Sequence, residues 1–161
     1  MIVNLLEHNL IKKASELGSH EYTEILYESD EVFSNKIRLF PRGCLGYLIN
    51  KELAAYIISF PWSSDLVPIN ELISLVKNPR CYYIHDLAIS KKYQNNGIGK
   101  LLANEAIKIG EELCFPQTTL VAVQDSDQFW KKLGFSIEEK IIYYGCNGYK
   151  MIRENKYVKT E

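Results

Sequence analysis

The sequence predicts an α+β (α/β) fold with a mixed β-sheet. In the middle of the chain, a β-like run over residues 82–90 is followed by a helical pattern over 98–113 and a second β-like run over 118–123. A strand, a helix and a strand in succession imply a parallel crossover. On either side of it, pairs of β-like runs are separated by short turns, as in antiparallel hairpins. Both kinds of pairing in one chain indicate a mixed sheet.

The elements before the central strand are predicted from periodicity and turn residues. We expect a strand over residues 1–6 and then two helices within residues 10–29, with a join near Gly18. Residues 30–42 fit no clear pattern. Two β-like runs, 44–49 and 53–60, predict a hairpin. Helical spacing of apolar residues over 68–78 predicts a further helix that ends before Pro79.

The elements after the central helix are short. A strand over 118–123 precedes a helix over 126–133, for which Gly134 is the expected C-terminal cap. The runs 135–144 and 149–153 predict a last antiparallel pair, joined by residues 145–148. We expect the tail, 154–161, to be frayed.

Length and composition indicate a single globular domain of 161 residues, divided into an N-terminal strand and helices (1–43), a sheet core (44–153) and a tail (154–161). The net charge of −1 favours neither nucleic acid nor a membrane as partner. Four dispersed cysteines without a CxxC pair argue against a metal site. No N-terminal signal or apolar span is evident, so we expect a cytoplasmic protein.

The loop between the central strand and helix has the chemistry of an anion site. It reads Gln94-Asn95-Asn96-Gly97-Ile98-Gly99-Lys100. Asn and Gly tolerate positive φ, so successive backbone N–H groups can point into one concavity. The helix that begins near Ile98 adds unpaired N–H groups and the positive end of its dipole, which makes a diphosphate the natural ligand. Leu101 follows Lys100, so the loop is not a Gly-Lys-Ser/Thr nucleotide loop.

Two motifs in this order resemble the GNAT superfamily of acyl-CoA-dependent N-acyltransferases. The family's Gln/Arg-x-x-Gly-x-Gly/Ala motif is matched by residues 94–99, and its aromatic-aromatic-x-x-x-Gly-Phe pattern is matched by residues 129–135. The resemblance covers about residues 44–153. It implies a mostly antiparallel twisted sheet with a central, splayed parallel strand pair and helices on both faces.

The resemblance also implies acetyl-CoA as co-substrate, with no metal. Its pyrophosphate would lie on the N–H groups of the loop, and its pantetheine arm would lie along the central strand. Residues that follow the predicted strand 118–123 would contact the cofactor from the other side. The implied cofactor-binding residues are Leu87, Ala88, Ile89, Gln94, Asn95, Asn96, Gly97, Ile98, Gly99, Lys100, Gln124, Asp125 and Phe129. An N–H of the strand would act on the thioester carbonyl as an oxyanion-type donor.

The candidate catalytic residues lie on the central strand. Amide formation requires a neutral amine, and His85 has the pKa range of a suitable base. Its strand resembles that of arylalkylamine N-acetyltransferases, which carry histidines at the places of Tyr83 and His85; only the second is matched. Period two places Tyr83, His85, Leu87 and Ile89 on one face, and Asp86 on the other unless a bulge intervenes. A structural histidine is the alternative, and Asp86 would orient a neighbour or brace a loop.

The leaving group lacks its usual partner. Many GNAT enzymes place a tyrosine four residues before the Gly-Phe pair as general acid for the CoA thiolate, and this chain has Trp130 there. Indole supplies no acidic proton, so CoA would leave as thiolate or be protonated elsewhere. For Tyr143, Tyr144 and Tyr149, a structural role is favoured over a substitute role.

An aromatic acceptor pocket is expected from Tyr22, Trp62 and Tyr143, together with Tyr83. It favours an amine with an apolar or aromatic body. The predicted function is N-acetyl transfer to a primary amine of a small molecule, by a monomer or homodimer. The alternatives are a protein N-terminal or lysine acetyltransferase, which requires an open groove, and a non-catalytic acyl-CoA-binding regulatory module.

Overall fold

The computed structural model describes residues 1–21 and 26–156, and these residues form a seven-stranded sheet with the order β1-β2-β3-β4-β5-β7-β6. Its strands are β1 (Ile2–Asn4), β2 (Cys44–Ile49), β3 (Glu52–Trp62), β4 (Cys81–Ile89), β5 (Gln117–Ala122), β6 (Ser136–Tyr143) and β7 (Cys146–Glu154). β4 and β5 are parallel and the other neighbours are antiparallel. The predicted mixed, mostly antiparallel sheet is therefore confirmed.

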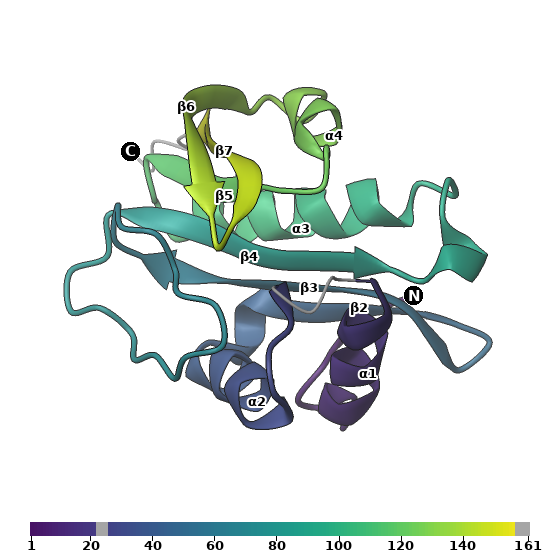
Figure 1. Cartoon of the computed structure of the whole chain (residues 1–161). Helices are drawn as coiled ribbons and strands as arrows, with labels where there is room; N and C mark the ends of the chain where they lie inside the picture. The colour runs from purple at the N-terminus through teal and green to yellow at the C-terminus, as the bar shows by residue number, and fades with distance from the viewer. Residues whose placement is uncertain (22–25, 157–161) are drawn as a thin grey trace.

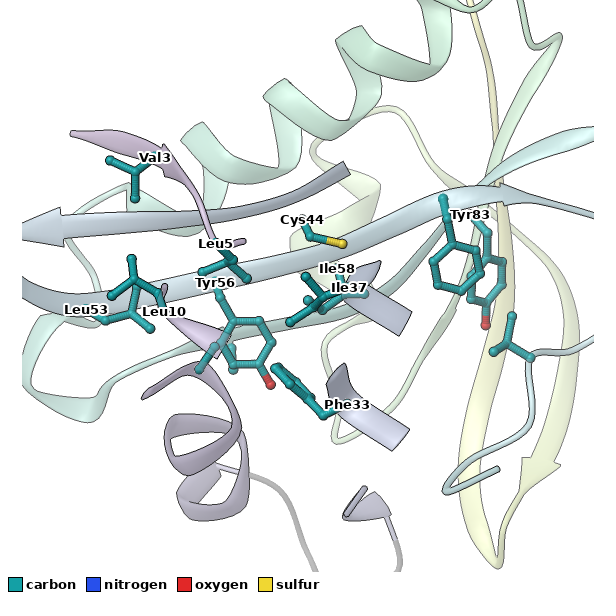
Figure 2. Close-up of a cluster of buried hydrophobic side chains, with 14 of the residues drawn as sticks. Val3, Leu5, Leu10, Phe33, Ile37, Cys44, Leu53, Tyr56, Ile58 and Tyr83 are labelled. Atoms are coloured by element: carbon teal, nitrogen blue, oxygen red, sulfur yellow. The ribbon is translucent and has the colours of Figure 1, made fainter. Parts of the chain in front are cut away.

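Helices cover both faces of the sheet, as predicted (Figure 1). α1 (Ile11–Glu21) and α2 (Asp30–Leu39) lie on one face, and α3 (Ile98–Glu112) lies on the other; the short α4 (Asp127–Lys131) follows β5. Each face has its own apolar core. On the α1 and α2 side, Tyr56 is fully buried and packs edge-on against Phe33, with ring centroids 5.3 Å apart (Figure 2).

The two parallel strands separate after a short contact. Their register runs only from Tyr82 opposite Thr118 to Ile84 opposite Leu120, although β4 continues to Ile89 and β5 to Ala122. The second half of β4 is thus paired with β3 but no longer with β5 among the described residues. This is the splayed parallel pair that the family resemblance implied, and it opens a site between the strands.

A β-bulge in β4 changes the predicted assignment of faces. Ile58 of β3 is opposite Asp86, whereas Ser59 is opposite Ile84, so His85 is the extra residue. Because a bulge shifts the period of two by one residue, Asp86 lies on the same side of the sheet as His85. Leu87 and Ile89 pack instead in the core on the α3 side. The prediction that they share a face with Tyr83 and His85 was therefore wrong.

The helix predicted over residues 68–78 is absent, and the segment is an irregular strap over α2. We call residues 63–80 the strap. Its backbone groups bond to side chains rather than to one another: Asn35 bonds both the N–H and the carbonyl of Ile73, and Lys36 Nζ donates to the carbonyl of Glu71. Asn70 has φ of 55°, which is incompatible with a continuous right-handed helix. Tertiary hydrogen bonds outweigh the helical spacing here.

Two other segments differ from expectation. Residues 30–39, which fit no pattern, form α2, whose first turn is capped by the Ser29 hydroxyl accepting from Val32 N–H. The tail is ordered as far as it is described, because β7 continues to Glu154 and buried Asn155 donates to the carbonyl of Phe115. Of the second predicted helix, residues 22–25 lie outside the described residues. Within the described ranges, the helices lack the length and apolar character needed to cross a membrane.

We predict that Gly43→Ala lowers the free energy of unfolding by about 3 kcal/mol, because overpacking against rigid backbone is costly. A Cβ at Gly43 would lie 2.1 Å from the carbonyl oxygen of Ser59 and 2.5 Å from the Tyr82 hydroxyl. Gly145→Ala is the control: it has φ of 78° but open space, so only the backbone strain of about 1 kcal/mol applies. Urea unfolding measures both, and equal losses would contradict the packing argument.

Candidate active site

A cavity of about 290 Å³ lies where β4 and β5 separate. It extends from the segment after β5 and α4 to the end of the α1–α2 connection and the strap. Of the residues singled out from the sequence, the cavity is lined by Tyr83, His85, Asp86, Leu87, Ala88, Ile89, Gln94, Gln124, Phe129, Trp130 and Tyr143. The central strand and the aromatic helix motif therefore meet at one site.

Other predicted residues lie outside this cavity. Asp125 is exposed beside it, and Asn95, Asn96, Gly97, Ile98, Gly99 and Lys100 form the adjoining loop and the start of α3. Trp62 is 8% exposed, packs edge-on against Phe60 and donates its indole N–H to the carbonyl of Asp65. It is a core residue rather than part of the cavity wall. Tyr22 lies outside the described residues.

The glycine loop has the backbone conformation expected of an anion cradle. Asn95 and Gly97 have φ of 65° and 76°, and Gly97 is the N-cap of α3 without a side-chain cap. The exposed side of the loop is open, since a Cβ at Gly97 would meet no atom within 4 Å. A Cβ at Gly99 would instead lie 2.6 Å from Ile89 Cδ1, so this glycine lets α3 pack closely on β4. First-turn N–H groups of a helix in this position attract anions.

A buried carboxylate holds His85 in place. Glu28 Oε1 lies 2.7 Å from His85 Nε2, and Glu28 Oε2 accepts from Lys36 Nζ at 2.7 Å and from the N–H of Asn70 at 3.0 Å. The three side chains are almost inaccessible, with 6% of Glu28, 2% of His85 and 1% of Lys36 exposed. Glu28 thus joins β4, α2 and the strap.

This arrangement sets the charge of Glu28. Burial disfavours its ionised form, but the opposing effects of His85 and Lys36 lower the pKa of Glu28 from 4.5 to about 2. A carboxylate accepts a hydrogen bond from a protonated ring nitrogen, so a neutral imidazole would carry its proton on Nε2 and its lone pair on Nδ1. His85 Nδ1 is buried and has no hydrogen-bond partner among the described residues.

Sequence reasoning missed Glu28. The available signal was Lys36, which lies on the apolar face of α2 with Val32, Phe33 and Ile37. A lysine on a buried helix face requires a carboxylate or carbonyl partner. Nothing in the sequence indicated which carboxylate supplied it, because Glu28 precedes α2 in a run of polar residues.

The tyrosines near the cavity are held in their neutral forms. Burial raises the pKa of Tyr83 and of Tyr143, and neighbouring ionisable groups raise both further. The Tyr143 hydroxyl donates to the carbonyl of Val67, which is fully buried. Because their pKa values are raised, neither Tyr83 nor Tyr143 is a ready proton donor at neutral pH.

Trp130 is 6% exposed and packs edge-on against Phe135.

The strap is fastened on both sides of the cavity. On one side the Tyr143 hydroxyl and Lys150 Nζ, from the β6–β7 hairpin, donate to the carbonyls of Val67 and Ser64. On the other side Glu28 accepts from Asn70, whose side chain in turn accepts from the N–H of Ser29. Ile69, between these contacts, lines the cavity. Hydrogen bonds thus fasten the strap to the β6–β7 hairpin and to the segment before α2.

Comparison with known proteins gives one family and one fold. The chain matches the acetyltransferase (GNAT) family over residues 8–135. It is similar to Ard1 from Thermoplasma volcanium (20% identity, TM-score 0.78, 97% of each chain covered). It is also similar to the ribosomal-protein-S18-alanine N-acetyltransferase from Escherichia coli, with 16% identity, a TM-score of 0.74, and 100% of this chain and 97% of that chain covered. A third similar structure is Arabidopsis thaliana Naa50 in complex with the bisubstrate analogue CoA-Ac-MVNAL, with 17% identity, a TM-score of 0.73, and 96% of this chain and 97% of that chain covered. At these identities the structures show the fold alone.

Within residues 1–21 and 26–156, no group of three or more His, Cys, Asp or Glu side chains is placed to hold a metal ion.

We predict a pH-dependent stability contribution from Glu28. Its pKa is about 2 in the folded protein and 4.5 ordinarily, so the unfolded chain takes up a proton first as the pH falls. The contribution, about 3 kcal/mol, is present above pH 4.5 and lost as the pH falls through 2. The stability difference between wild type and Glu28→Gln should therefore narrow by that amount between pH 6 and pH 2 in urea unfolding. Glu52→Gln is the control: hydrogen bonds from Tyr93 and Lys92 lower the pKa of Glu52 too, but its ion pair is exposed, so its stability difference should narrow far less. A difference for Glu28→Gln that stays constant with pH would contradict the assignment.

Proposed function

This chain belongs to the GNAT acetyltransferase family, and we propose that it moves an acetyl group from acetyl-CoA to the primary amine of a small molecule by direct attack on the thioester. The observation that supports this most strongly is the histidine on the splayed strand. His85 lines the cavity, is fixed through Nε2 by Glu28, and has a second ring nitrogen without a partner in the described structure.

The residues present fit acetyl-CoA. The open loop at Asn95 to Lys100 and the start of α3 offer N–H groups to the pyrophosphate. Leu87, Ala88 and Ile89 lie beyond the end of the β4–β5 pairing and line the cavity, which suits a pantetheine arm. Gln124 and Phe129 line the opposite wall. Naa50, a chain of similar fold, binds a CoA-containing bisubstrate analogue, which supports CoA chemistry for this chain as well. Bound acetyl-CoA would supply the activated acetyl group.

His85 is the proposed base. An amine attacks only in its neutral form, so its ammonium must first lose a proton, directly or through one water. The hydrogen bond from His85 Nε2 to Glu28 favours the tautomer in which Nδ1 carries the lone pair. After proton transfer, the Glu28 carboxylate stabilises the imidazolium. Glu28 is too weakly basic for the task itself, because Lys36 and His85 keep its pKa near 2. Glu28 is therefore a positioning residue.

The CoA leaving group departs as thiolate in this proposal. Trp130 occupies the position of the usual tyrosine, and Tyr143 uses its hydroxyl to hold Val67. Raised pKa values of Tyr83 and Tyr143 make both poorer acids than a thiol, which ionises near pH 8.5. As the C–N bond forms and the C–S bond breaks, the nitrogen loses its second N–H proton, which reaches the thiolate through solvent, and the His85 imidazolium releases the first proton to solvent.

The strap supports a small acceptor. It is tied to the hairpin at Val67 and Ser64 and to Glu28 at Asn70, so these hydrogen bonds hold it beside the acceptor end of the cavity. A volume of about 290 Å³ is at the low end for a ligand site, and the pantetheine end must share it. The carboxylates of Glu21, Glu28 and Asp86 line the cavity and favour a cationic amine. A protein N-terminus is the second candidate, supported by the peptide portion of the Naa50 analogue.

We predict acetyl-CoA-dependent thiol release with small primary amines. A panel of aromatic, aliphatic and polyamine acceptors is compared with tetrapeptides of varied first residue. The kcat/KM should be at least about tenfold higher for the best amine, because the fastened strap and the small cavity leave little room for the peptide's following residues. A preference for peptides would favour the second candidate. Stabilisation by acetyl-CoA in thermal unfolding without thiol release from any acceptor would indicate a non-catalytic acyl-CoA-binding module.

We predict that His85→Gln lowers kcat by about 10²–10⁴-fold, the usual contribution of a general base. Glutamine can still donate an amide N–H to Glu28, so the buried pair is kept while the base is lost. The KM for acetyl-CoA and the thermal shift that it produces should change by less than about twofold, because the loop and the pantetheine wall are untouched. Retention of wild-type kcat in His85→Gln would remove the assignment of His85 as base.

A further inference from the structure

Ile69 is the residue through which the strap reaches the main cavity. Of the strap residues, all of which the structure describes, it alone lines that cavity, and it is half-buried. The strap backbone is held on both sides of it: the carbonyl of Val67 accepts from the Tyr143 hydroxyl, and the N–H of Asn70 donates to Glu28 Oε2 at 3.0 Å. The side chain of Ile69 therefore has a fixed place at the cavity.

Two tyrosines line the cavity on the same side and present their rings to it. The Tyr143 hydroxyl is used by the carbonyl of Val67, and the Tyr83 hydroxyl interacts with the same carbonyl and with Tyr143. The ring of Tyr83 lies beside that of His85, with centroids 6.3 Å apart. An apolar surface thus extends from His85 across the tyrosine rings to Ile69. We call the side chains of Tyr83, Tyr143 and Ile69 the acceptor surface.

One buried carboxylate fixes both ends of this surface. Glu28, 6% exposed, binds His85 Nε2 through Oε1 at 2.7 Å, and its Oε2 accepts from the N–H of Asn70, the residue after Ile69. The separation between His85 and Ile69 is therefore set by a single group. A site of fixed dimensions distinguishes ligands that differ by one methylene group, by about 10–200-fold in kcat/KM.

The charges of the cavity lie outside the acceptor surface, whose three side chains are neutral. Both oxygens of Glu28 have partners in His85, Lys36 and the strap, so this carboxylate has no oxygen left for a second cation. Glu21 and Asp86 also line the cavity and attract the ammonium form of an amine. A second ammonium group on the acceptor surface would lose its hydration without gaining a carboxylate. Glu21 is the group that would favour a diamine.

We infer that the acceptor is a primary amine with an apolar body, which lies on the acceptor surface while its nitrogen lies at His85, and that Ile69 limits its length. The inference rests on the proposed function and names its acceptor class. Apolar contact stabilises a complex in proportion to the area that it removes from water, so a longer body binds better until it reaches Ile69. A body that extends further must displace the fastened strap.

A series of straight-chain primary amines, each one methylene group longer than the last, tests this limit. In wild type, kcat/KM should rise with length to an optimum and fall at least about tenfold for the next member. Ile69→Ala should move the optimum to longer amines, and Ile69→Phe should move it to shorter ones. The KM for acetyl-CoA should stay within about twofold of wild type in both, because the change is confined to the acceptor end.

Ile73→Ala is the matched control, since it makes the same deletion in the same strap. Ile73 packs against the apolar core on the α1 and α2 side and lies outside the cavity lining. This variant should lower the free energy of unfolding and leave the optimum length unchanged. An equal shift of the optimum in Ile69→Ala and Ile73→Ala would mean that a loosened strap, rather than the Ile69 side chain, sets the length, and it would overturn the inference.

Binding is measured separately from turnover, by thermal unfolding with CoA and each amine. The stabilisation by the amine should show the same optimum and the same shifts in the Ile69 variants. If wild type acetylates amines but its optimum does not move in these variants, or if a diamine exceeds the monoamine of equal length, the inference is overturned and the proposed function stands. If no amine is acetylated, the proposed function fails. The thermal shifts then decide the inference: a length dependence that moves with residue 69 supports the acceptor surface, and its absence overturns it.

Discussion

The carboxylate of Glu28 is the interaction on which the candidate site depends. It joins segments that are far apart in sequence: the connection before α2, β4 through His85, α2 through Lys36 and the strap through Asn70. Burying these charges is costly, and the pairing offsets the cost only if each partner is present. Apolar replacements of buried ionic groups are often neutral for stability, so we infer that this group is retained for the geometry that it imposes. It binds Nε2 of His85, while Nδ1 has no hydrogen-bond partner among the described residues.

The bulge at His85 is a single extra residue in β4, and it changes which side of the sheet the following residues face. One extra residue in β4 puts Asp86 on the side of α1 and sends Leu87 and Ile89 to the core under α3. His85 and Asp86 thereby lie on the same side of the sheet, and Leu87 and Ile89 pack on the other. A regular strand would have buried a carboxylate among the apolar side chains of the α3 core, where its desolvation would be costly.

The fold was predictable where local signals and tertiary packing agree. The strand, loop and helix over residues 81–112, the hairpins and the Gly134 cap follow from periodicity and glycine chemistry, and the positive φ values at Asn95, Gly97 and Gly134 match the residue types. Prediction failed where contacts distant in sequence decide. The strap has helical spacing, yet Asn35 and Lys36 satisfy its backbone. Glu28 could not be identified because its partners lie 8, 42 and 57 residues away. Trp62 was assigned to a pocket from its residue type alone.

The strap links stability to acceptor choice. Since its backbone hydrogen bonds are made with Asn35, Lys36 and Glu28, it cannot withdraw from the cavity without exposing the buried ion pair. An irregular segment held only by its own turns would open at little cost, whereas this one opens only when charged groups lose their partners. Widening the acceptor end to admit a polypeptide would thus disturb the carboxylate that positions His85. In the proposed function, the contacts that orient His85 would therefore also limit the size of the amine acceptor.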